Sequence, residues 1–209
     1  ADEAGLKRLL RNTNYLVILI SFFLVSGSFS LAMFYSPPLL EDIGIHRAWI
    51  GPIQCIGVVV EIALFRCLPA WIRRWNYAAT ILTGCLCLLC RQLLFGFCDN
   101  PWVLSGSYAL AVMVIVFYHI AASILVNAIA GVEVRATAQT LLVLIGSGMG
   151  PMFANWTAGR LAAGAGNSLR PVFLFAAALA ALASLMILFR GGRLNELKAS
   201  GVINDGDAK

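Results

Sequence analysis

Long apolar runs separated by short polar breaks dominate the pattern of this 209-residue chain. A helix needs about 20 residues to cross a bilayer at a rise of about 1.5 Å per residue. Six runs reach that length, and none has the period-2 alternation of barrel strands. The pattern therefore predicts an all-α polytopic membrane protein with six transmembrane helices. The predicted spans are residues 15–35, 48–72, 77–98, 103–129, 136–160 and 171–189.

The breaks between the runs have the composition of turns. Pro37 and Pro38 are predicted to stop the first helix, because proline lacks an amide N–H and disfavours helical angles in the preceding residue. Residues 73–76 and 99–101 are predicted to form tight turns, and residues 164–168 a looser one. The predicted regions are a basic amphipathic cytoplasmic lead-in (1–14), a six-helix transmembrane lobe (15–190) and a polar cytoplasmic tail (191–209).

Composition makes lipid the expected solvent. Apolar residues make up 60% of the chain and charged residues 12%, whereas soluble domains are about 45–50% apolar and about 25% charged. The net charge of +5 would favour nucleic acid in a soluble protein. Here most Lys and Arg residues lie between the apolar runs, so no nucleic-acid partner is predicted. Because the first residue is Ala1, we expect the chain to be part of a longer protein.

Loop charges predict the orientation of the helices. With six crossings, ten Lys and Arg residues lie on the side of both termini and three on the other side. Cytoplasmic loops carry the excess of basic residues, so both termini are predicted to be cytoplasmic, in an inner or plasma membrane. The ten are Lys7, Arg8, Arg11, Arg73, Arg74, Arg135, Arg190, Arg193, Lys198 and Lys209, and the three are Arg47, Arg160 and Arg170.

Two motifs resemble metal-binding or catalytic sequences without the context that such chemistry needs. Cys87 and Cys90 form a CxxC motif inside a predicted span, without four zinc ligands or a thioredoxin-like βαβ pattern. Gly146-Ser147-Gly148 lacks the GxSG motif of intramembrane serine proteases, because no glycine lies two positions before Ser147. We therefore predict no metal site, no cofactor and no enzymatic activity.

Three charged residues lie inside predicted spans, where a charge costs about 2.5–3.5 kcal/mol on insertion scales. Arg66 lies near the end of its helix and can extend to the lipid headgroups. Glu61 lies roughly 16 Å and Arg91 roughly 22 Å from the cytoplasmic surface. Their similar depths predict an ion pair, either purely structural or serving a functional Glu61.

Polar side chains also recur at helical spacing, and together they predict a wet cavity. A single such side chain is more often an interhelical hydrogen bond than a ligand contact. Gln54 shares a helix face with Glu61, two turns away. His119, Ser123 and Asn127 repeat every four residues, and Gln139, Ser147 and Asn155 repeat every eight.

Ordered segments spread over some hundred residues carry a family resemblance. They are Val58-Val59-Val60-Glu61-Ile62, Leu68-Pro69, Arg73-Arg74, Arg91-Gln92-Leu93-Leu94-Phe95, Asp99, Val134-Arg135-Ala136-Thr137-Ala138-Gln139, Gly148-Met149-Gly150 and Gly159. These segments resemble helices eight, nine and eleven of the nucleoside:proton symporters of the major facilitator superfamily. Phe117 and Tyr118 match that family's paired aromatic residues on helix ten.

The resemblance implies the C-terminal six-helix half of a twelve-helix transporter that works by alternating access. Its implied partners are a small polar solute such as a nucleoside, a proton, the lipid bilayer and the missing N-terminal half. Glu61 matches the family's functional carboxylate on helix eight, so it is the expected proton-coupling residue. The alternative is a self-contained six-helix channel or scaffold that oligomerises. The candidate cavity residues are Gln54, Phe117, Tyr118, His119, Ser123, Asn127 and Gln139.

Overall fold

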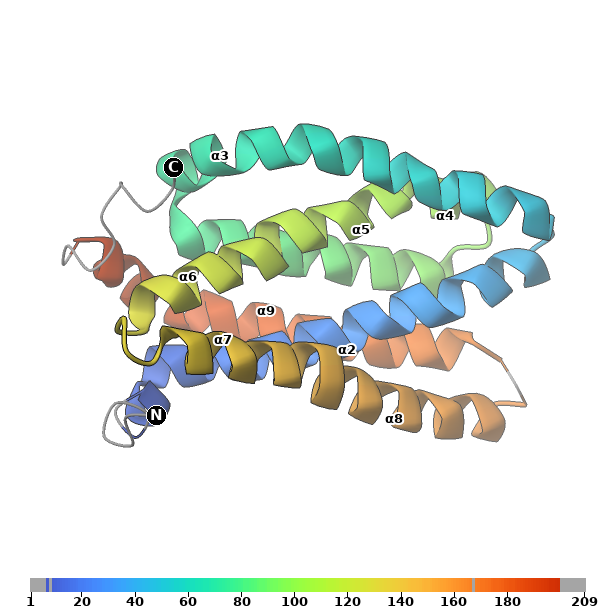
Figure 1. Ribbon diagram of the computed structural model, residues 1–209. Helices are drawn as coiled ribbons and strands as arrows, with labels where there is room; N and C mark the ends of the chain where they lie inside the picture. Colours follow the sequence, from blue (N-terminus) through green and yellow to red (C-terminus); the bar gives the residue numbers. More distant parts are fainter. Residues whose placement is uncertain (1–6, 8, 167, 200–209) are drawn as a thin grey trace.

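The computed structural model describes residues 7, 9–166 and 168–199, and its long helices form an antiparallel bundle (Figure 1). Five helical segments in this part of the chain are long and apolar enough to cross a membrane. The predicted all-α class with several apolar helices is therefore confirmed for the described residues. The five segments are Thr13–Asp42, Arg47–Phe97, Pro101–Ile129, Arg135–Gly164 and Arg170–Gly191.

Helix α2 (Thr13–Asp42) is the most buried of the spans, with 72% of its most apolar window inside the bundle. The prediction that Pro37 and Pro38 stop this helix is wrong, because the helix continues through both. Leu39 and Leu40 are buried in its last turn. The packing of these two leucines stabilises the helical turns in which the two prolines cannot donate a backbone hydrogen bond.

Helix α3 (Arg47–Phe97) is 51 residues long and consists of two arms that meet at a kink. Asn76 forms this kink with φ of 68° and ψ of 170°, a left-handed value of φ that Asn tolerates better than most residues. Its Oδ1 accepts a hydrogen bond from the N–H of Ala79 at 3.0 Å, which caps the second arm. The predicted turn at 73–76 is thus confirmed in position. We call 47–75 the first arm, 77–97 the second arm and the kink the elbow.

The next two spans each contain a short π-helical stretch. π-Helical stretches are rare in proteins, and those that do occur are often found at functional sites. Pro151 lies two residues after the end of the second stretch and cannot supply an amide N–H to it. One span comprises α4 (Pro101–Gly106), α5 (Tyr108–Val114), η1 (Ile115–Ile120) and α6 (Ala121–Ile129), and the other comprises α7 (Arg135–Val143), η2 (Leu144–Met149) and α8 (Gly150–Gly164).

Helix α9 (Arg170–Ala199) packs against α2 and α3. It extends through residues 191–199, which the sequence pattern assigned to the polar tail. This stretch is rich in Arg, Leu, Glu, Lys and Ala, which favour helix. The rest of the predicted tail, 200–209, lies outside the described residues, as do 1–6 and 8 of the predicted lead-in.

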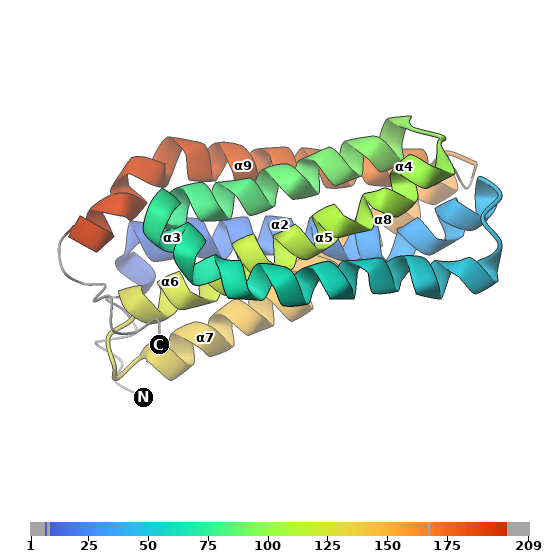
Figure 2. The same cartoon turned by 90° about the horizontal axis from the view of Figure 1, so that it is seen from above.

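The α5–η1 segment lies between the two arms of α3 (Figure 2). A Cβ added to Gly57 of the first arm would lie 2.9 Å from a methyl carbon of Val112. A Cβ added to Gly84 of the second arm would lie 2.8 Å from Cβ of Tyr118. Glycine at these two positions therefore lets the two arms and the α5–η1 segment approach closely. The α5–η1 segment separates the first arm from the second.

Candidate solute cavity

A cavity of about 230 Å³ lies between α2, the η1–α6 segment and the α7–α8 span. Its described lining combines hydroxyl groups, aromatic faces and one imidazole, without a carboxylate, ammonium or guanidinium group. Polar groups set among apolar and aromatic surfaces are typical of small-molecule sites. The lining residues are Phe22, Ser26, Phe29, Ser30, His119, Ser123, Leu142, Val143, Gly146, Ser147 and Pro151.

His119 is the most versatile polar group of the cavity, and η1 holds it in place. Its Nδ1 lies 3.4 Å from the carbonyl oxygen of Val114, five residues earlier. Because a carbonyl oxygen only accepts, this contact places the ring proton on Nδ1 and leaves Nε2 as an acceptor. Nε2 lies 3.3 Å from Ser26 Oγ, which can donate to it. The rings of Phe22 and Phe29 meet the imidazole edge to face, with centroids at 5.1 and 5.5 Å.

Two amides support the cavity from outside its lining. Asn155 on α8 donates through Nδ2 to Ser30 Oγ at 2.8 Å. Gln139 on α7 donates through Nε2 to the carbonyl oxygen of Ser123 at 2.8 Å and to Asn127 Oδ1 at 2.9 Å. These bonds join α2 to α8 and α6 to α7. Gln139 and Asn127 therefore position the cavity wall rather than form it.

Three other residues of the predicted cavity do not line it. Phe117 is fully buried and packs on Trp71, with ring centroids 4.9 Å apart. Tyr118 is fully buried, and its hydroxyl lies 2.7 Å from Ser21 Oγ. Gln54 lies half-buried on the first arm of α3. Of the predicted set, His119 and Ser123 reach the cavity.

The predicted ion pair between Glu61 and Arg91 is not formed in the described part of the chain. The prediction assumed that their helices are neighbours. The α5–η1 segment instead packs against Gly57 of the first arm and Gly84 of the second arm. Glu61 is half-buried and forms no hydrogen bond or ion pair with another described residue.

Arg91 is fully buried among aromatic side chains. Its guanidinium carbon lies 4.9 Å from the ring centroid of Phe95 and 4.8 Å from that of Tyr108. Its Nη2 donates to Ser36 Oγ at 3.5 Å, and Ser36 Oγ lies 2.8 Å from the Tyr108 hydroxyl. Cation–π contacts therefore stabilise this charge in place of a carboxylate.

Sequence reasoning missed the contribution of α2 to the cavity. Ser26 and Ser30 are four residues apart and therefore share a face, with Phe22 and Phe29 beside them. The available signal was the density of serine in an otherwise apolar helix, at Ser21, Ser26, Ser28, Ser30 and Ser36.

The fold and the cavity define a multi-pass helical membrane protein with a small polar chamber among its helices. Comparison with known proteins agrees with this class. The chain matches the MFS_1 like family over residues 1–175, and it belongs to that family. The family points to a transporter that binds a solute rather than to an enzyme. No match was found among curated proteins or among solved structures.

Proposed function

We propose that this chain is the C-terminal six-helix lobe of a secondary active transporter that moves a small polar solute by alternating access. The two arms of α3 count as separate crossings in this proposal, so the five spans give six. A nucleoside is the proposed solute and the proton the proposed coupling ion. The proposed location is the cell membrane, with both termini in the cytoplasm.

The position and lining of the cavity carry this proposal. The stretches η1 (Ile115–Ile120) and η2 (Leu144–Met149) lie near the middle of their spans, as do Ser26 and Ser30 in α2. Secondary transporters bind solute near the bilayer midplane, often at irregular helices. An uncharged chamber with hydroxyls, an imidazole acceptor and two phenyl faces suits a neutral solute with a flat ring.

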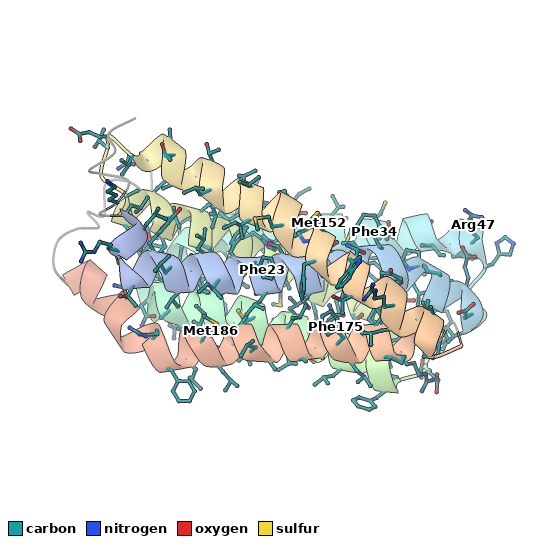
Figure 3. All side chains as sticks on the ribbon, turned by 90° about the horizontal axis from the view of Figure 1, so that it is seen from below. Phe23, Phe34, Arg47, Met152, Phe175 and Met186 are labelled. Atoms are coloured by element: carbon teal, nitrogen blue, oxygen red, sulfur yellow. The ribbon has the colours of Figure 1, made fainter. Side chains whose placement is uncertain are left out.

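The exposed surface of the bundle supports a missing partner half. Only 11% of the most apolar window of α3 and 22% of that of the α7–α8 span are buried. Figure 3 shows Phe34 of α2 and Met152 of α8, which are 67% and 71% exposed. Glu61 lies on the poorly buried first arm, where a carboxylate needs water or a polar partner. A second six-helix half would supply both a cover and a water-filled cleft.

Uptake by the complete protein tests the proposal. The full-length protein would be reconstituted in vesicles and offered radiolabelled nucleosides, hexoses and amino acids under an imposed pH gradient. We expect accumulation of an uncharged solute and a two- to tenfold rise in its half-saturation concentration for His119→Ala, about the effect of one lost hydrogen bond.

His46→Asn is the matched control. His46 is the only other histidine of the chain, and its Nδ1 accepts from the N–H of Ala48 in an exposed cap that Asn can replace. We expect unchanged uptake in this variant. Absence of uptake of any solute by a folded wild type would overturn the proposed function. Equal uptake by His119→Ala and wild type would show that this cavity is not the solute-binding site.

A further inference from the structure

The elbow of α3 gathers basic and aromatic side chains at one end of the bundle. Arg73 and Arg74 are exposed just before the kink at Asn76. The far part of α9 packs beside the elbow, because a Cβ added to Gly191 would lie 3.4 Å from Cβ of Ala78. Arg190, next to that contact, is half-buried. The elbow and the far part of α9 lie side by side at one end of the bundle (Figure 2), and Arg73, Arg74 and Arg190 belong to these two segments.

Two tryptophans form a platform beside these arginines. The rings of Trp71 and Trp75 are stacked, with centroids 5.3 Å apart and an interplanar angle of 24°. Trp71 also packs on Phe117, which fixes the platform to the core. Trp75 is 50% exposed, and the buried Nε1 of Trp71 has no hydrogen-bond partner among the described residues. Tryptophan is enriched at the headgroup level of a bilayer, and the half-exposed ring of Trp75 fits that position.

The arginines of this end have no carboxylate partners in the described part of the chain. Both described ion pairs, Arg47 with Glu41 and Arg170 with Asp99, lie at the opposite end, where Figure 3 labels Arg47. The carboxylate at the elbow end whose side chain the structure describes is Glu133, which is exposed and forms no ion pair with another described residue. The basic residues at this end whose side chains the structure describes are Lys7, Arg11, Arg73, Arg74, Arg135 and Arg190.

We propose that the elbow of α3 is a binding site for the headgroup of an anionic phospholipid. Arg73, Arg74 and Arg190 bind the phosphate, and the Trp71–Trp75 platform packs against the glycerol and the upper acyl chain. A headgroup phosphate supplies the negative charge that these arginines lack among the side chains that the structure describes. Basic residues at the membrane surface attract anionic lipids by about 1 kcal/mol each, or about fivefold in affinity.

Native mass spectrometry of the full-length protein with added phosphatidylglycerol or phosphatidylcholine tests this site. We expect wild type to retain phosphatidylglycerol in preference to phosphatidylcholine. Arg73→Gln/Arg74→Gln should weaken phosphatidylglycerol binding about 25-fold, from about fivefold per arginine. The matched control is Arg47→Gln/Arg160→Gln, which removes two charges elsewhere, one of them Arg160 stacked at 4.2 Å on Trp156. Binding by this control should stay within twofold of wild type.

A second measurement leaves the elbow intact. In a variant of the full-length protein that retains only Trp71 and Trp75, with Trp49, Trp102, Trp156 and every tryptophan outside this chain changed to Phe, brominated phosphatidylglycerol should quench fluorescence more than brominated phosphatidylcholine does. Equal quenching by the two lipids would overturn the proposal. So would equal loss of binding in both double variants, because that result indicates general charge attraction rather than a site at the elbow.

Discussion

Single polar side chains join α2 to its neighbours where water cannot replace their hydrogen bonds. Gln92 is fully buried, and its Nε2 donates to the carbonyl oxygen of Ser28 at 2.7 Å and to Ser28 Oγ at 3.0 Å. Ser28 Oγ donates in turn to the carbonyl oxygen of Ala176 at 2.8 Å. We predict that Gln92→Leu lowers the free energy of unfolding by about 1–2 kcal/mol. Unfolding in mixed micelles of increasing SDS fraction, followed by circular dichroism, measures this change.

Gln54→Leu is the control for that prediction. Gln54 is half-buried on the first arm of α3 and has no hydrogen bond to another described residue. We expect a change within about 0.5 kcal/mol, as for most substitutions away from buried polar contacts. An equal loss of stability in both variants would show that the Gln92 bonds contribute nothing measurable.

At the level of residues, the sequence predicts chemistry better than contacts. Helical spacing predicted a polar face that includes His119 and Ser123, and both side chains line the cavity. The ion pair between Glu61 and Arg91 was predicted from their similar depths in the membrane, and this prediction is wrong. Similar depth does not show whether another helix lies between the helices of the two residues. The cation–π environment of Arg91 depends on Tyr108, which is 17 positions further along the chain and on another helix. Such a contact has no signal in local spacing.

Glycines set how closely the helices approach. A Cβ on Gly84 would lie 2.8 Å from Cβ and 2.9 Å from the backbone nitrogen of Tyr118, and backbone cannot move aside as a flexible side chain can. We predict that Gly84→Ala destabilises the protein by about 1–3 kcal/mol, as overpacking does. The thermal midpoint from fluorescence-detected size-exclusion chromatography would fall. Gly159→Ala is the control, because nothing lies within 4 Å of its added Cβ, and its midpoint should stay or rise.

Whole elements follow from the sequence except where tertiary packing decides. The predicted turn at Asn76 is correct because the polar cluster 73–76 interrupts two apolar runs. The predicted stop at Pro37 fails because burial of Leu39 and Leu40 outweighs local proline preference. The π-helical stretches η1 and η2 have no signature in apolar spacing. They meet α2 through His119 with Ser26 and through Gly146, whose added Cβ would lie 2.1 Å from Phe22.

The whole molecule has a strongly basic elbow end, and this predicts its orientation. The ratio of ten basic residues to three predicts, by the positive-inside rule, that both termini are cytoplasmic. We predict that, in the full-length protein with all native cysteines replaced, including the six of this chain, Lys198→Cys stays unlabelled by an impermeant thiol reagent in intact cells. Arg47→Cys, at the opposite end, should be labelled. The reverse pattern would show that the elbow faces the exterior.

We propose that the complete transporter is coupled to protons and that Glu61 is the coupling carboxylate. Glu61 is half-buried inside a span and has no ion-pair partner among the described residues. Its carboxylate must therefore be protonated, hydrated by water or paired with a group of the missing half. Binding a proton on one side of the membrane and releasing it on the other would bias the two states of alternating access. A membrane potential of 100 mV supplies about 2.3 kcal/mol per proton, or about 50-fold accumulation of solute.

Glu61→Gln keeps the size of the side chain and removes its exchangeable proton. We predict that this variant loses uphill accumulation in vesicles with an imposed pH gradient but retains solute exchange across the membrane. Glu41→Gln is the matched control, since Glu41 is a carboxylate outside the cavity that pairs with Arg47 at 3.6 Å, and its accumulation should equal that of wild type. Full accumulation by Glu61→Gln would place the coupling carboxylate outside this lobe, because Glu61 is the only acidic residue within the six predicted spans.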